Sequence, residues 1–144
     1  MKGPFMLAAL LVATAGGTAG SAQFRISSGP VRDEVRGIVP AQLKMLTRGD
    51  FDAAYDLAAA GIRRQFGRRS FGAMIRREYP PLLHANKTDL GLVRDNGAGE
   101  ARLDVMITDR LGRSTVCQSR LVKETALWRI AAVVPAERPS HGDI

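Results

Sequence analysis

The spacing of apolar residues changes once along this chain, near residue 81, and this change limits the folds that it can adopt. Before that point apolar side chains recur every three or four residues, for example at Val31, Val35, Leu43 and Leu46, as on the buried face of a helix. Beyond it they alternate with polar side chains, as in strands that bury one face. Helices followed by strands are typical of the α+β class, in which helices cover one face of a sheet.

Three helices are expected in the first half of the chain. The first covers 31–46 and includes Pro40, which has no backbone N–H to donate. We therefore expect a kink near Gly37 or a helix that restarts with Pro40 in its first turn. Asp50 is the expected N-cap of a second, short helix that ends at Gly61.

The third helix is expected over 71–78, with Ser70 as its N-cap, and two prolines at 80–81 stop it. A meander of four mainly antiparallel strands follows, curved around the helices. The alternation of apolar and polar residues places these strands at 88–94, 100–108, 114–122 and 128–134.

The composition narrows the class of protein. A length of 144 residues favours one domain, and 45% hydrophobic with 24% charged residues excludes a disordered polyampholyte and an integral membrane bundle. One cysteine rules out an internal disulfide framework, and with only two histidines a Cys/His zinc site is not expected. We expect neither a cofactor nor a metal ion.

The first residues resemble a secretory signal. Lys2 precedes an apolar run over 6–15, and the small residues at 20–22 fit a cleavage site after Ala22. The sequence therefore predicts a periplasmic or secreted protein whose mature chain begins at Gln23. The expected organisation is a signal peptide (1–22), a polar lead-in (23–30), one domain (31–135) and a flexible tail (136–144).

A series of short motifs resembles the family called domain of unknown function 4864. The resemblance covers 31–135 and rests on Gly49-Asp50-Phe51-Asp52-Ala53-Ala54-Tyr55, Gln65-Phe66-Gly67, Ser70-Phe71, Tyr79-Pro80-Pro81-Leu82 and Trp128-Arg129-Ile130. That family is similar to the nuclear transport factor 2-like superfamily. The resemblance implies a cone with an apolar pocket, used elsewhere by isomerases, dehydratases, cyclases and non-catalytic dimerisation modules, so the fold alone does not settle function.

The implied pocket supplies the candidate site residues. His84 is a candidate general base near neutral pH, and Tyr79 a candidate partner in proton transfer. The other reading is a half-exposed loop histidine and core tyrosines whose hydroxyls bond to the backbone. The candidate lining residues are Tyr55, Phe71, Met74, Tyr79, His84 and Trp128.

Other polar or reactive residues have structural explanations. Asp104 shares a strand face with Arg102, which predicts a solvated cross-strand ion pair. Cys117 lies inside a strand, without the helix N-terminus that activates a thiol, and is expected to be buried. Trp128 is expected to anchor the last strand in the core, or alternatively to line the mouth of a pocket.

The net charge of +7 comes partly from an arginine-rich segment within 63–77. We expect a solvated basic surface, with weak contact to anionic surfaces as the alternative for Arg63, Arg64, Arg68 and Arg69. Nucleic acid is not an expected partner, because the chain carries no nucleic-acid-binding motif.

These observations favour an exported, non-catalytic module that binds a small apolar ligand or another protein. The alternative is an isomerase, dehydratase or cyclase acting on an apolar small molecule through His84 and a tyrosine. A homodimer through the open face of the sheet is also expected. Its surface would combine Met106, Val116 and Val122 with Arg102, Asp104, Gln118 and Arg120.

Overall fold

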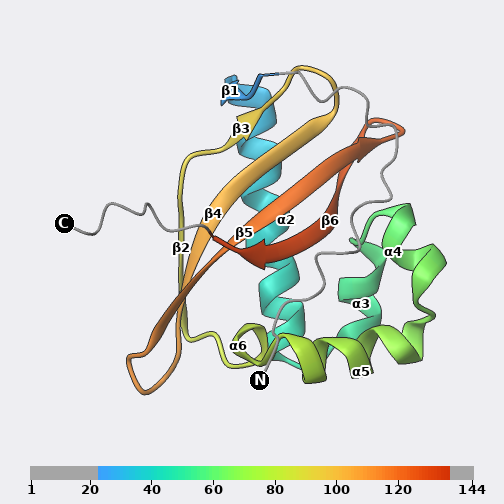
Figure 1. The fold of residues 1–144 in the computed structure, drawn as a ribbon, viewed down its shortest axis with the longest axis vertical. Coiled ribbons are helices and arrows are strands. Elements are labelled where there is room, and N and C mark those ends of the chain that lie inside the picture. The colour runs from blue at the N-terminus through green and yellow to red at the C-terminus, as the bar shows by residue number, and fades with distance from the viewer. Residues whose placement is uncertain (1–22, 137–144) are drawn as a thin grey trace.

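One long helix, α2 (Gly29–Thr47), crosses one face of the sheet (Figure 1). The computed structural model describes residues 23–136, so the predicted signal peptide and nearly all of the predicted tail lie outside the described residues. The helix does not restart at Pro40, as one alternative had it, but continues through the proline. Val35 and Val39 before Pro40 and Leu43 and Leu46 near the end of the helix are all buried, and this continuous stripe offsets the hydrogen bond that proline cannot make.

The second predicted helix is divided in two. Asp50 is the N-cap, as predicted, and its carboxylate accepts a hydrogen bond from the N–H of Ala53 at 3.2 Å. The expected end at Gly61 is wrong, because that residue lies inside a further helix. The link between the two pairs with Ile130 of the last strand, so a tertiary contact ends the first helix. The two helices are α3 (Phe51–Asp56) and α4 (Ala60–Gln65).

The third predicted helix, α5 (Arg68–Glu78), begins earlier than expected. Its N-cap is Gly67, and the predicted N-cap Ser70 is instead the third helical residue, whose Oγ accepts the N–H of Gly67 at 3.0 Å. A single turn, α6 (Pro80–Leu83), follows and leads into the sheet. The structure therefore has more helices than the three expected, but they occupy the predicted half of the chain.

The sheet is antiparallel, with the strand order β1-β3-β4-β5-β6 and with β2 also paired to β4. The predicted strand at 88–94 forms two separate strands, interrupted where Gly91 donates its N–H to the carbonyl of Asp104 at 2.8 Å. Another strand lies in the predicted polar lead-in. The strands are β1 (Arg25–Ile26), β2 (Lys87–Leu90), β3 (Arg94–Asp95), β4 (Glu100–Thr108), β5 (Ser114–Glu124) and β6 (Leu127–Pro135).

The two faces of the sheet differ as the alternation predicted. The inner face, including Leu103, Val105 and the free thiol of Cys117, is buried against the helices. On the outer face Asp104 lies opposite Gln118, and the predicted cross-strand ion pair of Asp104 is not among the ion pairs of the described residues. The cross-strand pairs of that outer face are Arg102–Arg120, Asp104–Gln118 and Met106–Val116.

Candidate functional site

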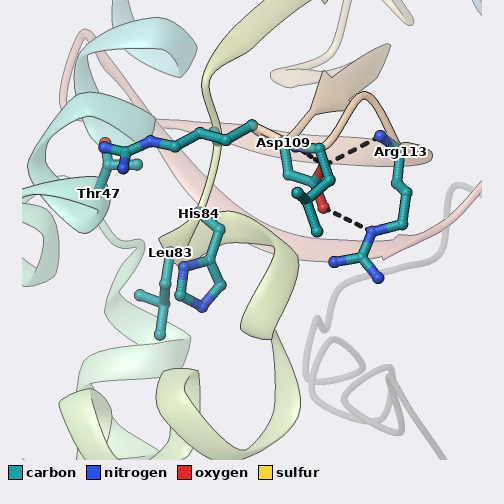
Figure 2. A pocket seen from close by; sticks show the side chains of 8 residues that line it. Thr47, Leu83, His84, Asp109 and Arg113 are labelled. Atoms are coloured by element: carbon teal, nitrogen blue, oxygen red, sulfur yellow. Dashed lines mark hydrogen bonds and ion pairs between the residues drawn. The ribbon is translucent and has the colours of Figure 1, made fainter.

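An open cleft of about 640 Å³ lies between the helix ends and the hairpin that joins β4 to β5 (Figure 2). The end of α2 contributes Thr47, and the residues after α6 contribute a histidine. The hairpin supplies the opposite wall, with two arginines and an aspartate. The lining residues are Thr47, Leu83, His84, Ala85, Asp109, Arg110, Leu111 and Arg113.

Asp109 holds the hairpin in shape. Its carboxylate accepts hydrogen bonds from the backbone N–H groups of Leu111 and Arg113, both at 2.9 Å, and from Nε of Arg113 at 3.1 Å. These hydrogen bonds hold the pKa of Asp109 below its ordinary value, and the bond from the backbone N–H of Arg113 has the largest effect. Gly112 has a φ of 84°, a left-handed conformation that suits glycine in this tight turn. The carboxylate is therefore an anion whose hydrogen bonds stabilise its own hairpin.

His84 follows α6 directly and is exposed. Its backbone N–H donates to the carbonyl of Pro81 at 3.3 Å, which fixes the chain at the point where the helical layer ends. Figure 2 shows its imidazole pointing away from the Asp109–Arg113 pair. A second space of about 260 Å³, also lined by His84, lies beside Ile107. His84 thus lines two open spaces at the surface rather than an enclosed chamber.

The two tyrosines are engaged within the protein. Tyr79 donates its hydroxyl to the carbonyl of Val133 at 2.8 Å, and burial raises the pKa of Tyr79 above its ordinary value. Tyr55 donates to the carbonyl of Phe66 at 2.6 Å, with the carbonyl of Arg63 also within reach at 3.2 Å. Both hydroxyls therefore bond to the backbone, the arrangement usual for buried tyrosines.

The apolar interior is largely filled. Phe71, Met74 and Tyr79 meet around a space of only about 30 Å³, and Tyr55 packs edge-on against Phe71 with the ring centroids 5.3 Å apart. Trp128 is 3% exposed and lies elsewhere in the core. The structure thus brings together four of the six candidate lining residues, and it places His84 away from them in the cleft.

Sequence reasoning missed the hairpin side of the cleft. The strands predicted at 100–108 and 114–122 leave 109–112 only as the hairpin turn between them, although an aspartate, two arginines and a glycine within positions 109–113 indicate a stabilised basic loop. The partner wall, at Thr47, lies more than sixty positions earlier in the chain. Only the tertiary fold brings these two segments together.

Part of the arginine-rich segment is tied to the helical layer. Arg68 forms ion pairs with Asp56 at 2.8 Å and with Asp52 at 3.6 Å, and its guanidinium lies 5.0 Å from the ring centroid of Tyr55. Arg63 donates to the carbonyl of Ala58 at 2.9 Å. These arginines therefore have structural contacts within the domain.

Residues 23–136 show neither a metal-binding cluster nor a membrane-spanning helix. In this part of the chain, no group of three or more histidine, cysteine, aspartate or glutamate residues is placed to hold a metal ion. No helix among the same residues is both long and apolar enough to cross a membrane.

Comparison with known proteins gives a family and a fold. The model of a family described as a domain of unknown function (DUF4864) matches residues 30–142. No curated protein matches the chain significantly. Aln2 from a Streptomyces species is similar in structure, with a TM-score of 0.55 at 16% identity over 78% of this chain and 94% of that one.

A second similar structure is the solution structure of RPA3114, a SEC-C motif containing protein from Rhodopseudomonas palustris. Its TM-score is 0.53 at 12% identity, over 69% of this chain and 77% of that one. At these identities both comparisons concern the fold alone.

Proposed function

We propose that this chain, which belongs to the DUF4864 family, is a non-catalytic binding protein that holds a small anionic ligand in the cleft around His84. The observation that carries the proposal is the cleft itself. Its volume of about 640 Å³ lies within the usual range for ligand sites. Arg110, Arg113 and His84 offer N–H donors there, and Leu83 and Leu111 offer apolar surface.

The charge of the cleft favours an anion. Asp109 neutralises Arg113 through their ion pair, which leaves Arg110 as the excess cation of the lining. A guanidinium binds a carboxylate or phosphate through two parallel hydrogen bonds. An apolar ligand that carries one such group would therefore match both kinds of lining side chain.

The alternative is an enzyme of the isomerase, dehydratase or cyclase kind, with His84 and Tyr79 in proton transfer. A general base of this kind works within hydrogen-bond reach of its substrate and is oriented by a neighbouring group. Asp109 is committed to its own hairpin, and the Tyr79 hydroxyl donates to Val133 in the core. Binding without catalysis is therefore the better supported function.

We also propose that the domain is of the nuclear transport factor 2-like type and is exported. The first proposal is supported by the order of helices before an antiparallel sheet. The second is supported by Lys2, the apolar run over 6–15 and the small residues at 20–22. An intact mass that begins at or near Gln23, measured on protein from the cell envelope, supports export. A full-length mass in the cytosol contradicts it.

Native mass spectrometry of the protein purified from its own host tests the ligand proposal. The wild type should retain a small anionic molecule, and Arg110→Gln should lose most of it. Arg64→Gln is the matched control, because it removes the same charge from an exposed position on α4. Equal retention by all three proteins would place the ligand elsewhere, and a wild type without any ligand would count against the proposal.

A further inference from the structure

Three arginines lie in one row across the outer face of the sheet. Arg94 of β3 is directly opposite Arg102 of β4, which is directly opposite Arg120 of β5. Like charges that face each other across strands destabilise a sheet. None of the three forms an ion pair within the described residues. The row therefore concentrates positive charge that the described part of the chain does not neutralise.

Two of these guanidinium groups are held in place. The guanidinium of Arg102 lies 3.8 Å from the centroid of the Phe24 ring, which comes from the segment just before β1. Nε of Arg120 donates to Oε1 of Gln118 at 2.8 Å. Partial burial, together with the charge of Arg120, lowers the pKa of Arg102. Both groups are thus positioned and partly removed from water before any anion arrives.

A cavity of about 180 Å³ lies beside these two arginines. Its lining includes Ala132 of β6, which pairs with Arg120. The pairing of β5 with β6 shifts register between Arg120 and Leu121, and this irregularity adds Ala131 to the wall. Small apolar side chains therefore lie in the wall next to two cations.

One carboxylate, that of Glu100, also lines the cavity. Its Oε1 accepts a hydrogen bond from Nδ2 of Asn96 at 3.2 Å, which ties it to the turn between β3 and β4. Two arginines against one carboxylate leave the cavity with a net positive charge.

We propose that this cavity binds the carboxylate or phosphate group of a small molecule, whose apolar part lies against Phe24 and the two alanines. Paired guanidinium groups bind such planar or tetrahedral anions through several charge-assisted hydrogen bonds. The site is separate from the cleft around His84. Arg102 and Asp109 are seven positions apart on or next to β4, which places them about 23 Å apart along an extended strand.

Titration of ¹⁵N-labelled protein tests this proposal, with amide shifts recorded by NMR. Phenyl phosphate and benzoate are the two anionic probes, and phenol is the neutral control of the same shape. Either anionic probe should give saturable shifts at Arg120, Ala131 and Ala132, and phenol should not. Tighter binding of one anionic probe identifies the preferred group. Shifts confined to the cleft around His84, or no saturable shifts, would overturn the proposal.

Two variants assign the binding to the row. Arg102→Gln and Arg120→Gln should each weaken binding of the preferred probe at least tenfold, whereas the matched control Arg64→Gln should bind as the wild type does. Without ligand, Arg120→Gln should also unfold at a higher temperature than the wild type, because it removes repulsion between like charges. Unchanged affinity in both variants would overturn the proposal.

Sedimentation under the same conditions separates a small ligand from a second copy of the chain. The wild type and Arg120→Gln should sediment alike. A wild-type dimer that Arg120→Gln converts to monomer would assign the row to the predicted dimer interface and overturn the small-molecule proposal.

Discussion

Replacement of Trp128 tests two opposing contributions to the free energy of unfolding: the burial of a large apolar ring, which stabilises the fold, and an unsatisfied indole N–H, which destabilises it. The residue is 3% exposed, and its indole N–H has no hydrogen-bond partner among the described residues. Truncation of a buried aromatic to alanine costs about 3–5 kcal/mol, because the cavity relaxes only in part. A buried donor without an acceptor costs about 1–3 kcal/mol, which truncation removes. We therefore expect Trp128→Ala to destabilise by about 2 kcal/mol.

Trp128→Phe separates the two contributions. Phenylalanine keeps one aromatic ring and loses the part of the indole that carries the N–H. The lost apolar contact costs about 1–2 kcal/mol, and the removed unsatisfied donor returns a similar amount. The free energy of unfolding should stay within about 1 kcal/mol of the wild type.

Urea unfolding followed by far-ultraviolet circular dichroism is the suitable assay, since the chain has a single tryptophan and both variants lack it. A phenylalanine variant as unstable as the alanine variant would refute the reasoning about the indole N–H. An unchanged urea midpoint for Trp128→Ala would refute its assignment to the core.

Three further changes have definite expected outcomes. Tyr79→Phe deprives the carbonyl of Val133 of its donor and should cost about 1–2 kcal/mol in urea unfolding. Burial, with the charge of Asp104 as a smaller cause, raises the pKa of the Cys117 thiol to about 12, from an ordinary value of 9.0. Because the unfolded chain loses this proton first, stability should be level below pH 9 and fall between pH 9 and about 12. Cys117→Ala should flatten that fall in pH-dependent urea midpoints. Asp50→Ala removes the N-cap of α3 and should lower thermal stability by about 1 kcal/mol; an unchanged melting temperature would show that the cap is redundant.

The sequence predicted correctly those features of the fold that depend on residues close together in the chain. The alternation over 100–108 gave the bounds of β4, because each of its faces meets a different environment. The N-cap at Asp50 could also be predicted from local sequence, because its carboxylate accepts a hydrogen bond from the backbone N–H of the third residue after it. The division of the second predicted helix at 57–59 could not be predicted in this way, because pairing with Ile130 on a distant strand ends α3.

Only part of the candidate site could be predicted from the sequence. His84 stood out because it is the one histidine between residues 23 and 136. Its neighbours in the cleft, Arg110 and Arg113, come from a hairpin whose approach depends on the whole sheet. How completely Phe71 and Met74 fill the interior depends on side-chain packing in three dimensions, which spacing along the sequence does not encode.

The pairing between the helical layer and β6 also protects the edge of the sheet. β6 is the last strand in the order, so one side of it is open to pairing with another chain. The N–H and C=O of Ile130 are taken by Leu57 and Ala59, and the hydroxyl of Tyr79 bonds the carbonyl of Val133. An approaching strand finds these groups already occupied. The short link between α3 and α4 is therefore a built-in barrier to edge-to-edge aggregation.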